Sequence, residues 1–359
     1  MIYRCLLILG FVLIAWLPNL PLVSGQSTAM IEFFAAGKQQ QGLTLVDHAH
    51  ELIVIGRDGW MHSIDPREQA GKIRHTKATY SVASVAELRN DLRAEFGPDY
   101  EVLATNSFLV VQPRGRGDRW PRMFEQSHRA FIAFMKKRGV RIRKGRFPLI
   151  AIVFPDEQAM YAEFERQKIQ VSRVAGIYSG DSNRVMTHDG GQSTFVAATV
   201  RHEAAHQSAF NFGVHSRVND TPRWITEGIG QMFEPSAMAE TTTSRLSDRV
   251  NRDSLRFIRS QTKNRDNTKF SQAMMQLISN EAMFEDPKKI VEAYAVSWAM
   301  MFYLAERQPK AFAELLQHTA TRPAFQAYTR TERLQDFERI VGEPPLEFSR
   351  RVLHWLEKF

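Results

Sequence analysis

Two histidines four residues apart are the first candidates for chemistry in this sequence. His202 and His206 flank Glu203 in the segment HEAAH, residues 202–206. Residues four apart lie on one face of a helix, so both imidazoles can bind a single metal ion. Glu203 could then act as a base on a water molecule at that ion. The competing interpretation is a surface helix with two incidental histidines, since the chain contains 11 of them.

A catalytic zinc site needs a third protein ligand and one open position. Metzincins place a glycine and a histidine three and six residues after the second histidine, but this chain has Ala209 and Phe212 there. Glu227 is a better candidate, because Thr221 as N-cap and Pro222 in the first turn predict a new helix that carries it. The intervening loop is long enough to fold this helix back beside the first. The sequence therefore predicts a His-His-Glu site.

The segments around this site resemble the gluzincin branch of the zinc metallopeptidases, and in particular its peptidase-MA-like bacterial members. The likeness covers residues 174–305, about a third of the chain. The matching segments are HEAAH at 202–206, WITEG at 224–228, the stretch from Gly176 to Val185 and the stretch from Tyr294 to Leu304. The resemblance implies a zincin-like fold, Zn²⁺ bound by His202, His206 and Glu227, and a water activated by Glu203.

The sequence departs from this family four residues after Glu227. Thermolysin-type gluzincins carry a carboxylate there that orients a histidine ligand, whereas this chain has Gln231. A neutral acceptor should leave the histidine less electron-rich. Asp220 or Glu234 could supply the carboxylate instead, and the sequence leaves both alternatives open.

A further group must stabilise the negative charge that develops on the substrate oxygen. Tyr294 is the first candidate, because a phenol can donate a hydrogen bond to an oxyanion and a helix beginning at Asp286-Pro287 would carry it. Tyr178 and His215 are the next candidates. The competing interpretation of Tyr294 is a packing residue of the same helix.

The hydrophobic patterns predict an α+β protein. We expect a small mixed N-terminal domain over residues 26–115, followed by a zincin-like metallopeptidase domain over 116–359 with a short mixed sheet and a mostly helical C-terminal half. The linker candidate is the polar, glycine-rich stretch 114–118. The expected strands lie within 29–62 and at 108–113, 149–154, 174–178 and 184–186. The expected helices run from a capping box at Ser84 to Gly97, over 121–138 and 156–167, and through most of the chain after Ser193.

The N-terminus is expected to be a secretory signal peptide, residues 1–25. Arg4 precedes the apolar run 5–17, and small residues follow at 23–25. This order is typical of signal peptides, and the run is shorter than the roughly 20 residues of a membrane-spanning helix. We therefore expect a secreted or periplasmic protein with no stable membrane span after cleavage. A membrane anchor is the alternative if the segment stays uncleaved.

Composition narrows the chemistry and the partners. The single cysteine, Cys5, lies inside the expected signal peptide, so the mature chain has no disulfide, thiolate ligand or cysteine nucleophile. The formal charge of +8 and a pI near 9.6 favour anionic partners. Nucleic acid is not expected for an exported protein. The densest basic cluster, from Lys136 to Arg146, is either a solvated group at a helix C-terminus or a contact for anionic cell-envelope material.

These residues support three functions of different kinds. The favoured one is a secreted zinc-dependent metallopeptidase that hydrolyses peptide bonds, with Glu203 as general base and Tyr294 as oxyanion donor. The second is a catalytically inactive zincin, a zinc-stabilised domain that binds peptides or the cell envelope. The third is a basic adhesion module in which the HEAAH segment is accidental.

Overall fold

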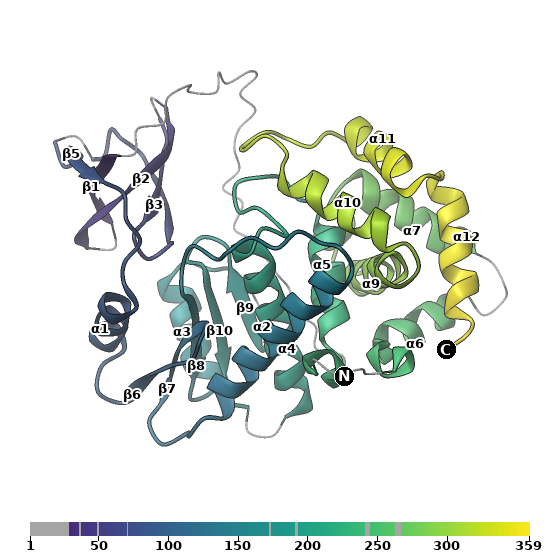
Figure 1. The fold of residues 1–359 in the computed structure, drawn as a ribbon, viewed down its shortest axis with the longest axis horizontal. Coiled ribbons are helices and arrows are strands. Elements are labelled where there is room, and N and C mark those ends of the chain that lie inside the picture. Colours follow the sequence, from purple (N-terminus) through teal and green to yellow (C-terminus); the bar gives the residue numbers. More distant parts are fainter. Residues whose placement is uncertain are drawn as a thin grey trace. The chain divides into compact units, whose positions relative to one another are not determined.

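The computed structural model describes residues 29–35, 37–48, 50–69, 71–171, 174–190, 193–240, 245–262 and 267–359. Within these ranges the chain is mixed α+β, with two sheets in its N-terminal region and a mostly helical C-terminal half (Figure 1), which confirms the expected fold class. The expected signal peptide lies outside the described residues. No helix of the described ranges combines the length and apolar character needed to cross a membrane.

The described chain divides into two compact units. The helical unit consists of Asp118–Gly145 and Gly190–Phe359, and the sheet unit contains the residues up to Gly117 together with Arg146–Asp189. Each unit therefore combines segments from distant parts of the sequence.

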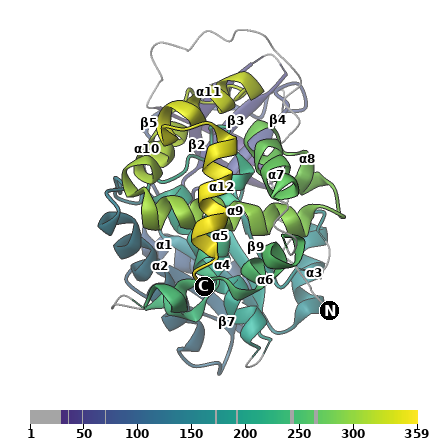
Figure 2. The same ribbon diagram turned by 90° about the vertical axis from the view of Figure 1, so that its right-hand side faces the viewer.

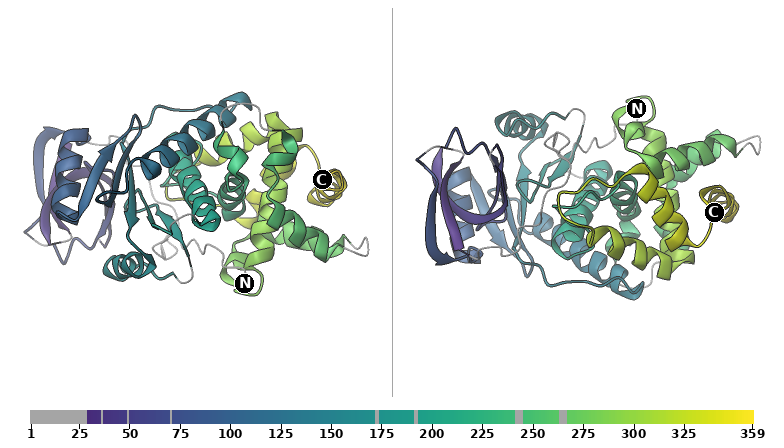
Figure 3. Two further views of the ribbon diagram at one scale, coloured as in Figure 1. Left: turned by 90° about the horizontal axis from the view of Figure 1, so that it is seen from below. Right: turned by 90° about the horizontal axis from the view of Figure 1, so that it is seen from above.

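The first sheet of the sheet unit is antiparallel throughout. Its strands are β1 (Ala29–Ala35), β2 (Lys38–Asp47), β3 (Leu52–Gly56), β4 (Met61–Ile64) and β5 (Arg74–Thr79), in the order β4-β3-β2-β1-β5. A hairpin turn joins β3 to β4, and Gly59 adopts a φ of +90° there. Phe33 and Val54 are fully buried in the core of this sheet. Figure 3 shows the strands of this sheet in purple and dark blue.

The second sheet is mixed and carries helices on it. Its strands are β6 (Tyr100–Ala104), β7 (Phe108–Pro113), β8 (Leu149–Phe154), β9 (Gly176–Ser179) and β10 (Arg184–His188), in the order β6-β7-β8-β10-β9. All six residues of β8 are buried, and β8 lies between two parallel neighbours, as its unbroken apolar run predicts. Helices α1 (Val85–Phe96) and α3 (Glu157–Arg166) pack on the sheet through Leu88, Leu92, Met160 and Phe164.

The signals predicted at the two ends of α1 are confirmed. Ser84 and Glu87 form the predicted capping box of α1, and Gly97 ends that helix with a φ of +76°.

The second sheet joins strands from both sides of the domain boundary expected at residues 115 and 116. Whether that boundary separates two folding domains stays a prediction.

The helical unit is built around one buried helix. Its helices are α2 (Arg119–Lys137), α4 (Thr194–Asn211), α5 (Arg223–Phe233), α6 (Arg252–Gln261), α7 (Thr268–Ser279), α8 (Ala282–Glu285), α9 (Ile290–Arg307), α10 (Pro309–Ala320), α11 (Arg330–Val341) and α12 (Pro345–Leu356), with short 3-10 turns η1 (Ser236–Ala239) and η2 (Leu246–Arg249). Helix α9 is apolar on nearly all sides, so it packs at once against α5, α6, α7, α8, α10 and α12 (Figure 2). Helix α4 packs against α2 and α5.

Candidate metal centre

Helix α4 presents the two histidines. Ser193 caps it, its hydroxyl accepting a hydrogen bond from the amide of Val196 at 3.4 Å. The helix ends at Asn211, and Gly213 follows with a φ of +81°. Because α4 is packed between α2 and α5, the whole stretch from His202 to Ala209 is buried.

Helix α5 presents Glu227, but the predicted start of this helix is wrong by one residue. The N-cap position is Pro222 rather than Thr221, and no side chain of the cap residue bonds to the helix. A carboxylate distant in sequence fills the role of the cap instead: Glu281 Oε2 accepts a hydrogen bond from the amide of Arg223 at 3.2 Å. A carboxylate at this end both satisfies an exposed N–H group and complements the helix dipole.

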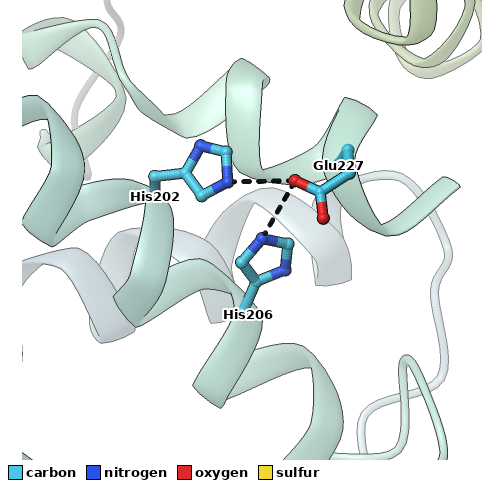
Figure 4. Close-up of side chains that lie close together, drawn as sticks. All are labelled: His202, His206 and Glu227. Carbon is cyan, nitrogen blue, oxygen red and sulfur yellow. Dashed lines mark ion pairs between the residues drawn. The ribbon is translucent and has the colours of Figure 1, made fainter. Parts of the chain in front are cut away.

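The three predicted ligands converge in the helical unit. Glu227 Oε2 lies 3.4 Å from His202 Nε2 and 3.7 Å from His206 Nε2 (Figure 4), and all three side chains are at most 2% exposed. These ligand atoms lie within 4.8 Å of one another and could hold a metal ion. The two Nε2 atoms and both oxygens of Glu227 have no hydrogen-bond partner among the described residues.

These separations fit a common ion better than they fit hydrogen bonds. Donor and acceptor of an N–H···O bond are usually 2.7–3.2 Å apart, a range that both distances exceed. Ligands 2.0–2.1 Å from one tetrahedral Zn²⁺ would be about 3.3–3.4 Å from each other. The 3.4 Å distance from Glu227 Oε2 to His202 Nε2 matches this ligand–ligand distance, and the 3.7 Å distance to His206 Nε2 is slightly longer. Buried nitrogen and oxygen atoms that lack hydrogen-bond partners and lie at this spacing can bind a metal ion.

The charges within the group are strongly coupled. Burial alone lowers the pKa of His202, but the carboxylates of Glu227 and Glu234 outweigh it and raise that pKa well above its usual value. Burial likewise raises the pKa of Glu227, yet His202 and His206 outweigh it and lower that pKa. The centre therefore stabilises charge of both signs, and an ion that binds there must displace the proton from His202.

Glu234 is the carboxylate that contacts the site histidine. Glu234 directly follows α5, and its Oε1 accepts a hydrogen bond from His202 Nδ1 at 3.0 Å. Asp220, the other alternative, lies elsewhere in the unit, where it accepts from the amide of Tyr328 at 2.9 Å and pairs with Arg333 at 3.2 Å. The structure thus selects Glu234 of the two alternatives that the sequence left open.

Two glycines of α5 allow its close approach to the neighbouring helices. A Cβ atom on Gly230 would lie 2.4 Å from His202 Nε2, and one on Gly228 would lie 2.5 Å from both Ser297 O and Met301 Cγ of α9. Glycine inside a helix is unfavourable by roughly 1 kcal/mol. Gly230 is therefore explained by contact with the ligand histidine, and Gly228 by contact with α9.

Of the three candidates for the oxyanion donor, Tyr294 lies beside His202, one of the candidate metal ligands. Its ring meets that of His202 edge-on, with centroids 6.4 Å apart, and it also packs against Phe284 at 5.6 Å. The predicted helix start at Asp286-Pro287 is wrong, because Asp286 forms a turn and α9 begins at Ile290. Tyr294 is 1% exposed, so the expected packing role is fulfilled as well.

The other two candidates differ from each other. Tyr178 belongs to the sheet unit, where its hydroxyl donates to Asn183 Oδ1 at 2.9 Å across the β9–β10 turn. His215 belongs to the helical unit, and neither ring nitrogen has a hydrogen-bond partner among the described residues. Burial, together with repulsion from His206, lowers the pKa of His215 to about 3. His215 is therefore a neutral imidazole near the centre.

The basic cluster expected at the end of α2 divides into two kinds of residue. Arg138 is a structural cation: it pairs with Glu306, donates to the carbonyl of Ala305 at 2.8 Å and covers the ring of Phe134. The remaining cations of the helical unit in this cluster are exposed: Lys136, Lys137, Arg141, Arg143 and Lys144.

Sequence reasoning missed the polar groups that support the centre from outside it. Asn251 caps α6 through its Oδ1 and also donates to Glu234 Oε2 at 2.9 Å. Its signal was the N-cap pattern before α6, which says nothing of the site. Glu281, which holds the start of α5, had no signal in the sequence near Glu227.

Comparison with known families agrees with the location of this centre. A family described as a protein of unknown function, DUF1570, matches residues 196–326, a range that contains the three candidate ligands, Glu203 and Tyr294. Comparison with curated proteins gives no match. The chain is thus similar to DUF1570 over somewhat more than a third of its length, and the similar region holds a buried His-His-Glu group that could bind a metal.

Proposed function

We propose that the helical unit binds Zn²⁺ through His202, His206 and Glu227 and hydrolyses peptide bonds. The observation that carries this proposal is the set of buried, unsatisfied ligand atoms, 3.4 and 3.7 Å apart. Two imidazoles and one carboxylate form a ligand set common to catalytic zinc. The resemblance to gluzincins around the same residues supports zinc over other divalent ions.

Glu203 would serve as general base and then as general acid. A bound zinc ion would lower the pKa of water and polarise the substrate carbonyl. Glu203 follows His202 on α4 and is fully buried, so its carboxylate belongs to the same enclosed region. It would accept a proton from the attacking water and deliver it to the leaving amine.

Tyr294 would stabilise the negative charge on the substrate oxygen. Its ring stands edge-on to His202, and a phenolic O–H can donate to an oxyanion. A Tyr294→Phe variant should lower kcat with little change in zinc content. Unchanged kcat would reduce Tyr294 to the packing role it already has against Phe284.

An extended peptide backbone is the substrate we propose. The resemblance to gluzincins around the three candidate ligands supports this substrate class. Export is proposed from residues 1–25, and the exposed cations from Lys136 to Lys144 would contact anionic cell-envelope material.

A second candidate function is favoured by the burial of the centre. His202, Glu203 and Glu227 are each 0% exposed, so a substrate reaches them only if the surrounding structure opens. A domain that uses zinc for stability and binds peptides without cleaving them has no such requirement.

Zinc analysis and a cleavage assay separate these functions. Purified protein should hold about one zinc per chain and cut members of a peptide library, and a chelator should abolish cutting. Glu203→Gln should keep its zinc and lose roughly 10²–10⁴-fold in rate. Zinc far below one per chain would refute both functions. Normal zinc without cleavage would support the second function, and an active Glu203→Gln variant would refute the assignment of the base.

A further inference from the structure

The carboxylate of Glu234 accepts hydrogen bonds from three different side chains. Its Oε1 receives His202 Nδ1 at 3.0 Å and Gln231 Nε2 at 2.5 Å, while its Oε2 receives Asn251 Nδ2 at 2.9 Å. Two neutral amides therefore hold the carboxylate that contacts the ligand histidine.

The same amides are themselves fixed in place. Asn251 Nδ2 also lies 3.1 Å from Gln231 Oε1, and the hydroxyl of Ser254 donates to that oxygen at 3.2 Å. Asn251 Oδ1 accepts from the amide of Ser254 at 3.1 Å and so caps α6. The network thus ties the start of α6 to His202 through Gln231 and Glu234.

Glu234 needs such support because of where it stands. It is the residue after α5, where the partial negative charge of the helix end disfavours a carboxylate. Its side chain is 26% exposed, so water competes for its oxygens. Arg201 holds its backbone by donating to its carbonyl at 2.8 Å, but that contact leaves the side chain unconstrained. The amides of Gln231 and Asn251 supply the missing constraint.

We propose that Gln231 and Asn251 are positioning residues that direct the Glu234 carboxylate onto His202 and thereby set the affinity of the centre for its metal. The inference rests on the metal-binding part of the proposed function. With Nδ1–H committed to Glu234, His202 turns the lone pair of Nε2 toward the ion. The carboxylate has moved from position 231 to position 234, and an amide at 231 is required because it must donate to Glu234.

The sharpest test replaces Gln231 by the carboxylate that thermolysin-type gluzincins carry at that position. If the site worked as in thermolysin-type gluzincins, the Gln231→Glu variant would bind zinc at least as tightly as the wild type. We expect weaker binding, by roughly 10-fold, because a second carboxylate would face Glu234 and the donated hydrogen bond would be lost. Glu234→Gln should have the larger effect, roughly 10–100-fold. The dissociation constant is measured by competition with a chromophoric chelator for Zn²⁺.

Gln112→Glu is the matched control. Gln112 is also fully buried and donates to a carboxylate, Glu101 at 3.0 Å, but it belongs to the sheet unit. Its substitution should lower the melting temperature without changing zinc affinity. Equal losses of affinity in Gln112→Glu and Gln231→Glu would show a general effect of instability and would overturn the proposal.

A second variant keeps the proposal testable if Gln231→Glu does not fold. Asn251→Ser retains an oxygen that can cap α6 but removes the Nδ2 donor. It should weaken zinc binding several-fold and shift the visible absorption bands of the Co²⁺-loaded protein, because His202 is then less firmly oriented. Wild-type affinity and an unchanged Co²⁺ spectrum in Asn251→Ser would refute the proposal. Failure of the wild type to bind zinc would instead refute the proposed function.

Discussion

The helical unit contains two buried polar clusters that differ in one respect. Around Arg333 the groups find protein partners: its guanidinium pairs with Asp220 at 3.2 Å and with Glu281, and donates to the carbonyl of Tyr328 at 2.8 Å. Around Glu227 the carboxylate oxygens have no hydrogen-bond partner among the described residues, and Oε2 lies 3.4 and 3.7 Å from the Nε2 atoms of His202 and His206. Burying a polar group without a hydrogen-bond partner is costly. The first cluster meets this requirement with protein groups, whereas the second is a group that could hold a metal ion.

Breaking the complete cluster should have the largest effect on stability. Arg333→Met leaves the carboxylates of Glu281 and Asp220 without their cation, and should cost about 3–5 kcal/mol. Chemical denaturation with and without zinc measures it, and the loss should be similar in both conditions. Arg350→Met, which breaks the exposed pair with Glu347, should cost less than about 1 kcal/mol. Equal losses in the two variants would contradict the contrast.

The buried histidine His128, which is not one of the candidate metal ligands, extends the comparison to the effect of pH on stability. His128 has a neutral partner, with its Nδ1 2.9 Å from the hydroxyl of Ser208, and burial lowers its pKa to about 4. The unfolded chain therefore takes up a proton near pH 6.5 that the folded chain refuses until about pH 4. Burial of the neutral His128 therefore makes its full contribution to the free energy of unfolding above about pH 6.5. This contribution is lost as the pH falls from about 6.5 to about 4.

The contribution of His128 is isolated by comparing wild type with His128→Gln. In excess chelator, denaturation at pH 7.5 and 4.5 should show the wild type losing about 2–3 kcal/mol more than the variant on acidification. Parallel losses in the two proteins would mean that burial of this imidazole contributes nothing to acid sensitivity.

The glycines of α5 give the smallest effect and separate packing from ligation. Gly230→Ala and Gly228→Ala both overfill a tight contact and should each cost about 1–3 kcal/mol. Only Gly230→Ala presses on His202, so only it should weaken zinc binding as well. Zinc titrations of the two variants, made well below their melting temperatures, compare them. Equal zinc affinities would show that the approach of α5 to His202 is unimportant for ligation.

The parts of the fold that were predicted rest on local signals. The capping box at Ser84, the unbroken apolar run of β8 and the helical spacing of His202 and His206 each specify structure within a few residues. The strands β5 and β6 were not predicted. In β5 every residue is at least partly exposed, so its sequence lacks the alternation of apolar residues that predicts a strand.

The parts that were missed depend on residues distant in sequence. The predicted start of α5 was wrong by one residue because the carboxylate that accepts from the amide of Arg223 belongs to Glu281, the N-cap residue of α8, and not to a local cap. The choice of Glu234 over Asp220 depends on Arg333 and Tyr328, which hold Asp220 in the other cluster. The candidate ligands could be predicted from the spacing of the histidines and from the helix signal before Glu227, whereas the groups that contact them are known only from the tertiary structure.

Zinc binding by wild type and by Glu227→Gln is the most direct test of the central claim. The wild type should bind about one zinc per chain, and its melting temperature should fall when a chelator is added. In Glu227→Gln, zinc affinity should fall sharply and the melting temperature should no longer respond to the chelator. Equal zinc contents and equal chelator responses in the two proteins would contradict the assignment of this buried group as a metal centre.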